Sequence, residues 1–358
     1  MNILRIYLAI PPSPGGMERH IGELNAQQRA QGHVVTQVFT VGQQTGVTDV
    51  QVLAGWPILH LWPHALRDLI FYASASWRCW RLRLRADVLH VHGDWSAYAC
   101  GHFLGRILRA RVKVCSMHGA IGTDRRSLRH YRWVSRGYDV RYATGLREAA
   151  VLSRVVGKEW HWIASGLARS LIEGFEEGAA KRNDVIAVGS LVPVKGLDLL
   201  MEVARCLPGC HIAIVGDGRE ESRLRALASD LPNVTFLGAL SQPALARELS
   251  ASRLYVSTSH AEGTPTTMLE AMAAGLPVIT TASNDYSVVL GAGIGGEVLD
   301  GRDADAMALS VANWLGDPRR SAAASLRNRE YAGRRTWPWV AAEISRLLEL
   351  AVRAERKA

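Results

Sequence analysis

Two glutamates eight residues apart, Glu262 and Glu270, form the most informative pattern in this chain, within the segment 259–280, SHAEGTPTTMLEAMAAGLPVIT. Carboxylates are strong acceptors for sugar and ribose hydroxyls. Between them, Thr264 and Pro265 are the residue types that begin a helix. The free N–H groups of a helix N-terminus attract a diphosphate. The pattern therefore predicts a ligand that is anionic in its middle and polyhydroxylated at both ends, such as a nucleotide diphosphate sugar.

The elements around this pattern predict how the two glutamates are positioned. Strands are expected at 254–257 and 278–280, and between them a helix from Pro265 to Ala274, ended by Gly275 and Pro277. Glu262 would lie on the loop after the first strand, and Glu270 one turn inside the helix. The alternative is an ordinary capped helix with two surface glutamates, which an isolated pair at this spacing would favour.

Length and composition limit the class of protein. The chain has 358 residues, 48% hydrophobic and 21% charged, which fits a folded protein of two domains. Its five cysteines lack C-x-x-C spacing, so a disulfide framework or zinc ribbon is not expected and a reducing cytosol fits best. Residues 2–9 are interpreted as a first strand rather than a signal peptide, and no transmembrane helix is predicted.

The net charge of +9 is unevenly distributed along the chain. Residues 1–180 hold 22 Lys and Arg against 13 Asp and Glu, whereas residues 181–358 hold 20 of each. The basic half indicates an anionic partner: a phosphorylated lipid carrier, a membrane surface or nucleic acid. Nucleic acid is disfavoured because no nucleic-acid-binding module is recognisable.

Strand-like and helix-like segments alternate through both halves, which predicts α/β architecture with two doubly wound, Rossmann-like parallel-sheet domains. The small, polar stretch near 168–184 is the expected linker, and a cleft between the halves is the expected site. The predicted strands are 3–10, 34–41, 88–92 and 112–117 in the first half, and 185–188, 211–215, 234–236, 254–257 and 278–280 in the second.

Several blocks together resemble family 4 retaining glycosyltransferases of the GT-B fold, over nearly the whole chain. The blocks are PPSPGGMER at 11–19, VLHVHG at 88–93, SMHG at 116–119, VGSLVPVKG at 188–196, VGDG at 215–218 and the paired-glutamate segment. The resemblance implies an acceptor-side domain at 1–168, a linker at 169–183, a donor-binding domain at 184–334 and a helix at 335–358 that crosses back to the first domain.

The resemblance also assigns roles to individual residues. His118, Glu262 and Lys195 would be catalytic, with His118 and Glu262 facing the donor sugar and Lys195 the diphosphate. Glu270 would bind the ribose. Taken by itself, His118 fits a core histidine at a strand end better than a ligand role, and its alignment with the other blocks favours the functional role. The remaining donor-binding candidates, some from the glycine loop and some from the helix N-terminus, are Gly15, Gly16, Ser190, Gly263, Thr264, Thr266 and Thr267.

One position departs from the family pattern. Similar proteins carry arginine five residues before the lysine, and here that position is Ser190. Losing one cation from a diphosphate site weakens stabilisation of the leaving group. Three alternatives follow: another arginine such as Arg219 compensates, the enzyme is slow, or the chain is a degenerate family member.

The expected function is therefore metal-independent transfer of a hexosyl unit, with retention, from a nucleotide diphosphate sugar. The acceptor would be a saccharide or lipid-linked saccharide in cell-surface polysaccharide or lipopolysaccharide biosynthesis. No cofactor is expected. The alternatives are a nucleotide-sugar epimerase of the same fold and an inactive donor-binding partner subunit.

Three further features concern the acceptor side. His90, His92 and Asp94 form an H-x-H-x-D run, which a strand end opening into the cleft explains better than a metal site. Asp94, with Arg125 and Arg126 of a basic, aromatic run at 125–142, is a candidate for acceptor contact.

The third feature is an apolar stripe flanked by arginines in residues 66–85, interpreted as core-facing, with peripheral attachment to an anionic, cytoplasmic membrane face as the alternative. Its members are Leu66, Leu69, Ile70, Ala73, Trp77, Trp80 and Leu84. Trp56 and Trp62, just before this segment, favour the membrane alternative.

Overall fold

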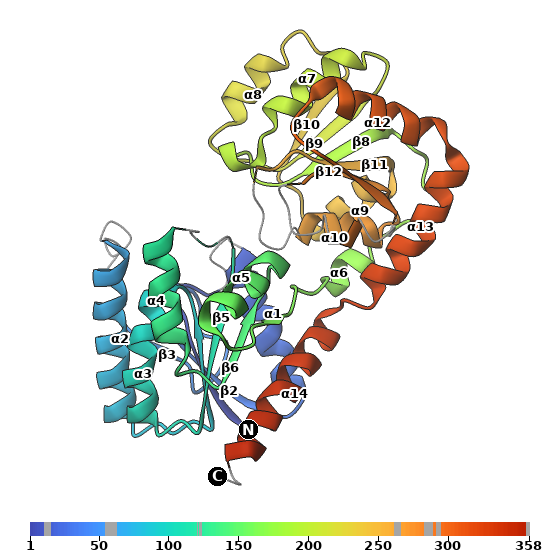
Figure 1. Ribbon diagram of the computed structural model, residues 1–358. Helices are drawn as coiled ribbons and strands as arrows, with labels where there is room; N and C mark the ends of the chain where they lie inside the picture. Colours follow the sequence, from blue (N-terminus) through green and yellow to red (C-terminus); the bar gives the residue numbers. More distant parts are fainter. Residues whose placement is uncertain are drawn as a thin grey trace. The chain divides into compact units, whose positions relative to one another are not determined.

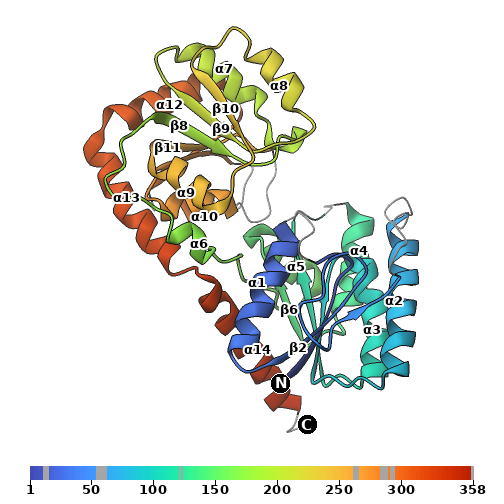
Figure 2. The same cartoon turned by 180° about the vertical axis from the view of Figure 1, so that it is seen from behind.

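The computed structural model describes residues 1–10, 16–53, 63–119, 121, 124–260, 266–282, 289–290 and 295–355. The chain forms two compact units, each built on a parallel sheet (Figures 1 and 2). Unit 1 comprises Met1–Ser165 with Trp337–Ala358, and unit 2 comprises Gly166–Thr336. The segment 169–183, predicted as a linker, contains the short helix α6 (Arg169–Ile172) and belongs to unit 2.

Unit 1 contains a seven-stranded sheet in the order β3-β2-β1-β4-β5-β6-β7. Every described pair of neighbouring strands is parallel, so crossovers must run over the faces of the sheet. The strands are β1 (Asn2–Ile6), β2 (Val34–Phe39), β3 (Val50–Gln51), β4 (Val88–His92), β5 (Val112–Met117), β6 (Val140–Ala143) and β7 (His161–Trp162).

Helices cover both faces of this sheet, which is why its central strands are continuously buried. Side chains such as Leu4, Leu89 and Cys115 face α2 (His64–Arg81), α3 (Trp95–Leu108), α4 (Arg125–Ser135) and α5 (Leu146–Val156). Ile3 and Val114 face the opposite layer of α1 (Gly16–Ala30) and α14 (Trp337–Glu355). In Figure 1, α1 and α14 lie together on the side of the sheet away from α2 and α3.

Unit 2 contains a six-stranded parallel sheet in the order β10-β9-β8-β11-β12-β13. The strands are β8 (Asn183–Val188), β9 (Ile212–Val215), β10 (Val234–Gly238), β11 (Ser252–Ser257), β12 (Val278–Thr281) and β13 (Gly296–Leu299). The helices are α7 (Asp198–Cys206), α8 (Glu221–Leu227), α9 (Gln242–Ser250), α10 (Thr266–Ala273), α12 (Ala304–Gly316) and α13 (Pro318–Gly333), with a 3₁₀ turn η2 at Pro193–Lys195. Figure 1 shows α7, α8 and α12 on one face and α9 and α10 on the other.

The predicted α/β class with two parallel sheets is confirmed, and every predicted strand coincides with an observed one. Four strands were not predicted: β3, β6, β7 and β13. The basic, aromatic run at 125–142 spans two elements. It forms helix α4 and then enters strand β6, where Tyr142 is fully buried.

Candidate functional site

The sheet of unit 2 has a topological switch point between β8 and β11. From β8 the chain proceeds through β9 to β10 in one direction, and from β11 through β12 to β13 in the other. In open α/β sheets, ligands bind outside the carboxyl ends of the strands at such a point. The loops after β8 and β11 are therefore the structural candidates for the nucleotide-sugar site.

The loop after β8 carries Ser190 and Lys195. Ser190 is exposed, and Lys195 ends the turn η2 with its aliphatic chain over Gly189, where an added Cβ would lie 3.3 Å from the lysine Cε. Thr258, just after β11, donates from Oγ1 to the Lys195 carbonyl at 3.0 Å, and His260 N donates to the Val194 carbonyl at 2.8 Å. The two loops at the switch point are thus held together by hydrogen bonds.

Arg302 is a residue at this position that sequence reasoning missed. It precedes α12, and its guanidinium donates to the carbonyls of Thr258 and Gly196, the latter at 3.1 Å, with Asp198 3.7 Å away. Arg302 therefore joins the same two loops and places a cation at the loop that carries Lys195. No local pattern marks it, because its contacts come from residues distant in the sequence. Arg219, named above as an arginine that could compensate for Ser190, lies exposed just after β9.

Helix α10 carries the next candidates. Thr266 and Thr267 form its first two residues, and Thr267 Oγ1 lies 3.0 Å from the hydroxyl of Tyr255 on β11. Glu270 follows one turn later and is only 5% exposed. Burying a carboxylate costs free energy. A buried glutamate beside the switch point therefore fits a functional role better than a role as an ordinary surface residue. Glu262, Gly263, Thr264 and Gly15 lie outside the described residues, and Gly16 begins α1.

In unit 1, His118 follows β5 and lines a cavity of about 220 Å³ beside the carboxyl ends of β4 and β5. Its Nε2 lies 3.1 Å from Nδ1 of His92 and 3.2 Å from Oγ of Ser116. Burial lowers the pKa of His118 to about 3, and the charge of Arg5 acts in the same direction. The ring is therefore neutral at pH 7.

His118 belongs to a cluster of four histidines in the layer between the sheet and the α1–α14 pair, which we call the histidine cluster: His20, His90, His92 and His118. Alternation along β4 places His90 and His92 on the same face. The rings of His90 and His92 stack at 4.1 Å, and His20 contacts His118 edge to face at 4.6 Å. Burial lowers the pKa of His20, His90 and His92 well below the ordinary histidine value.

The H-x-H-x-D run belongs to this buried layer and to the start of α3. His90 Nδ1 lies 3.3 Å from a guanidinium nitrogen of Arg5, which can only donate. Asp94 is the N-cap of α3 and accepts from Ser96 N at 2.9 Å. Among the residues that the structure describes, no three His, Cys, Asp or Glu side chains are arranged to hold a metal ion.

Asp68 is a second functional candidate that the sequence did not reveal. It is buried, lines the same cavity as His118 and Asp94, and accepts from Ser96 Oγ at 2.5 Å, while that hydroxyl lies 2.6 Å from Asp94. Burial raises the pKa of the Asp68 carboxyl, although the hydrogen bond from Ser96 acts to lower it. Two carboxylates at one small cavity are suited to accept hydrogen bonds from a polyol ring.

The two arginine candidates lie apart from this cavity lining. Arg125 and Arg126 are exposed in the first turn of α4, whose N-cap is Asp124. Cations at a helix N-terminus oppose the helix dipole, so the local helix gains nothing from them. Both remain candidates for contact with an anionic group.

The core-facing interpretation of the apolar stripe on α2 is wrong. Trp77 and Trp80 are 55% and 67% exposed, and Leu66 and Leu69 are exposed as well. The buried side of the helix carries Asp68, Phe71, Tyr72, Ala75, Ser76 and Cys79 instead. The exposed row and the buried row are offset by only part of a helical turn. The row with the smaller and more polar side chains packs on α3 and is buried.

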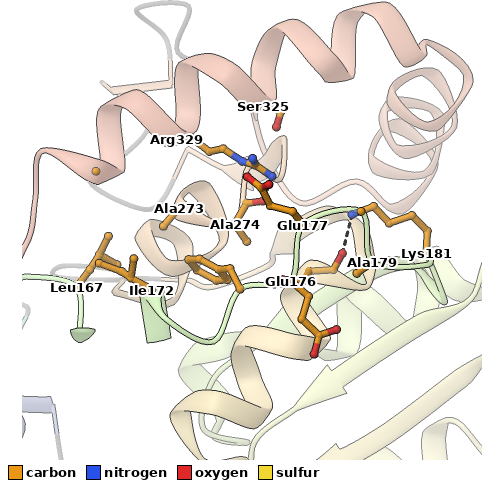
Figure 3. A pocket seen from close by; sticks show the side chains of 14 residues that line it. Leu167, Ile172, Glu176, Glu177, Ala179, Lys181, Ala273, Ala274, Ser325 and Arg329 are labelled. Atoms are coloured by element: carbon orange, nitrogen blue, oxygen red, sulfur yellow. Dashed lines mark hydrogen bonds between the residues drawn. The ribbon is translucent and has the colours of Figure 1, made fainter. Parts of the chain in front are cut away.

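Unit 2 has a larger cavity of about 570 Å³, away from the switch point. Ala273 and Ala274, at the carboxyl end of α10, line this cavity. Thr266 and Thr267 lie at the opposite end of that helix. Figure 3 shows Leu167 and Ile172 toward one end and Lys181 toward the other, with Lys181 Nζ donating to the Ser250 carbonyl at 2.7 Å. This cavity is separate from the donor candidates.

Comparison with known proteins agrees with this geometry. Residues 15–157 match the glycosyl transferase 4-like domain, and residues 172–333 match the glycosyl transferases group 1 family. The chain belongs to the group 1, family 4-like glycosyltransferases of the GT-B fold.

Several curated relatives come from Mycolicibacterium, Mycobacterium and Corynebacterium species. A GDP-mannose-dependent alpha-(1-6)-phosphatidylinositol monomannoside mannosyltransferase of Mycolicibacterium smegmatis is 32% identical over 45% of this chain and 46% of its own length. The chain thus spans about half the length of such curated relatives in these matches. A phosphatidyl-myo-inositol mannosyltransferase of the same organism is 25% identical over 97% of this chain and 94% of its own.

Solved structures share the fold at low sequence identity. A sucrose-phosphate synthase from Thermosynechococcus elongatus superimposes with a TM-score of 0.80 at 18% identity, covering 99% of each chain. Anabaena HepE, solved with UDP and glucose, gives a TM-score of 0.75 at 18% identity over 98% of this chain and 99% of its own.

Proposed function

We propose that this chain is a retaining hexosyltransferase that takes its sugar from a nucleotide diphosphate sugar. The observation that carries the proposal is the switch point of unit 2: the loop with Lys195 follows β8, and α10, with the buried Glu270 one turn inside it, follows the adjacent strand β11. Lys195 and the helix N-terminus suit a diphosphate, and Glu270 suits ribose hydroxyls.

GDP-mannose is the first donor to test, because two curated relatives are named as GDP-mannose-dependent. A retaining transfer needs stabilisation of an oxocarbenium-like centre and of the departing diphosphate. Lys195 would bind the diphosphate. Arg302 would supply part of the positive charge that similar proteins obtain from the arginine at the position of Ser190. Glu262 and His118 would act at the sugar.

The acceptor we propose is a polyol or saccharide head group carried on a lipid. The cavity beside His118 has room for about one sugar-sized ring, and Asp68 and Asp94 offer carboxylates to its hydroxyls. Relatives named for phosphatidylinositol acceptors support a lipid-borne polyol, and the cell-surface glycolipid setting is part of the proposal.

Peripheral membrane attachment is also part of the proposal, and the exposed face of unit 1 supports it. Trp77 and Trp80 on α2 stand among arginines, with Arg81 over the Trp77 ring at 5.4 Å. Phe103 on α3 and Trp133 on α4 are 61% and 80% exposed. Aromatic and cationic side chains together favour an anionic bilayer interface. No helix within the described ranges is long and apolar enough to cross a membrane.

The test is ligand-detected NMR of the purified protein with GDP-mannose, UDP-glucose, ADP-glucose and dTDP-glucose. The control is Glu270→Gln, which removes the charge without leaving the cavity that alanine would create in this buried position. We expect one donor to bind and the variant to lose it.

Product analysis separates the alternatives. Transfer to an added lipid acceptor supports the proposal. Sugar interconversion without acceptor would indicate an epimerase, and binding without turnover would indicate an inactive donor-binding subunit. Absence of donor binding would overturn the proposed site.

A further inference from the structure

The ring of His118 is held by two buried neighbours, and they decide which of its nitrogens carries the proton. Three atoms form a triangle: His92 Nδ1 to Ser116 Oγ at 2.8 Å, Ser116 Oγ to His118 Nε2 at 3.2 Å, and His92 Nδ1 to His118 Nε2 at 3.1 Å. His92 is 1% exposed and Ser116 is fully buried, and His92 lines the same cavity as His118.

Both rings are neutral near pH 7, because burial lowers the pKa of each, to about 3 for His118. A neutral imidazole has one N–H and one bare nitrogen. The two facing nitrogens are close enough that two protons or two lone pairs there would repel. Hence one of them is protonated and the other is bare, and the tautomer of His118 depends on that of His92.

The other ring nitrogen of His92, Nε2, indicates which of the two nitrogens of this ring carries the proton. His92 Nε2 is buried, and the described residues provide it with no hydrogen-bond partner. If His92 carried its proton there, a buried N–H would lack an acceptor, which folded proteins avoid more strictly than an unfilled lone pair. With the proton on Nδ1, His92 donates to Ser116 and the Ser116 hydroxyl donates to His118 Nε2.

We propose that the Ser116–His92 pair holds His118 as the Nδ1–H tautomer, so that His118 meets its ligand as a neutral hydrogen-bond donor and not as a base. His118 lines the cavity, and Nδ1 is its nitrogen that makes no hydrogen bond to a described residue. Resting on the proposed function, the partner of this N–H is an oxygen of the donor sugar or of the acceptor. Ser116 and His92 are positioning residues.

This assignment also limits what the cavity binds. A fixed N–H prefers a ligand oxygen with a free lone pair, such as a hydroxyl, ring or phosphate oxygen. Asp68 and Asp94, at the same cavity, act as acceptors. The cavity thus offers a donor and acceptors from different elements, an arrangement that a ring with several hydroxyls can satisfy in one orientation.

The test uses the full chain labelled with ¹⁵N-histidine, without ligand, in a long-range ¹H–¹⁵N correlation experiment at pH 7. Nitrogen shifts separate protonated from bare imidazole nitrogens, and His118→Gln assigns the signals. We expect His118 and His92 protonated at Nδ1. Protonation of His118 at Nε2 in the wild type would overturn the proposal.

Variants test the relay itself. Ser116→Ala should leave His118 as a mixture of tautomers, whereas the matched control Ser165→Ala, which removes the hydroxyl 3.0 Å from His20, should leave it unchanged. His92→Asn, whose amide nitrogen can donate to Ser116 in place of Nδ1, should keep His118 in the Nδ1–H tautomer. Unchanged His118 shifts in Ser116→Ala would refute the positioning role.

Activity adds a second readout. Where a donor is turned over, Ser116→Ala should lower kcat about tenfold, the loss expected for one hydrogen bond, with little change in donor KM. The NMR measurement needs neither donor nor acceptor. A protein that turns over no donor but shows the Nδ1–H tautomer would contradict the proposed function and leave the assignment of His118 standing.

Discussion

Acidification from pH 7 to pH 5 should unfold unit 1 before unit 2. His20, His90, His92 and His118 all have lowered pKa values, with burial as the main cause and with the charges of one another and of Arg5 opposing protonation as well. The unfolded chain binds protons at these residues near pH 6.5, whereas the folded unit does not. The free energy of unfolding therefore falls as pH drops below 6.5, down to about 3 for His118.

The size of the effect follows from the number of rings. Each histidine that stays neutral in the folded state lowers the free energy of unfolding by about 2 kcal/mol between pH 7 and pH 5. For four rings the loss is about 8 kcal/mol, which is comparable with the whole stability of a typical domain. Asp68 and Glu23, whose carboxyl pKa values are raised by burial, act in the opposite sense at lower pH.

The assay is hydrogen exchange of the intact protein, followed by mass spectrometry at pH 7 and pH 5 and corrected for intrinsic exchange rates. Peptides from β4 and β5 should lose protection at pH 5. Unit 2 is an internal control, because its two histidines, His211 and His260, are not buried. A variant with one titrating ring fewer, His20→Gln, should show a pH dependence smaller by about 2 kcal/mol. Equal protection of β4 and β5 at both pH values would refute this account of the cluster.

Four further predictions concern the site and the surface. Glu262→Gln should abolish transfer with an unchanged unfolding midpoint, measured by product assay and thermal melt; full activity would exclude Glu262 from the site. Ser190→Arg should tighten donor binding about tenfold, by calorimetry, and Ser190→Gln should not. Arg302→Gln should lower the free energy of unfolding by about 2 kcal/mol in urea titrations and weaken donor binding; equal stability would contradict its role between the two loops. Replacing Trp77 and Trp80 by serine should reduce sedimentation with anionic vesicles and leave binding to neutral vesicles equally weak.

The order of elements, and the loops and helices that carry the donor candidates, were accessible from the sequence. Alternating apolar runs and helix signals are local, so they identified both parallel sheets and placed Lys195, Thr266 and Glu270 near strand ends. In the first half the expected strand ends likewise lie just before Asp94 and His118. Short edge strands such as β3 and β7, two residues each, leave too little periodicity to be predicted.

Tertiary structure alone decided the rest, because these features depend on contacts between residues distant in the chain. Helix α2 has two apolar sides, and only its packing on α3 shows that Phe71 is buried while Trp77 is exposed. Asp68 is a candidate site residue because it hydrogen-bonds to Ser96, and Arg302 because it hydrogen-bonds to the loops after β8 and β11. The histidine cluster draws on α1, β4 and the segment after β5, and its neutrality comes from a burial that none of these segments has by itself.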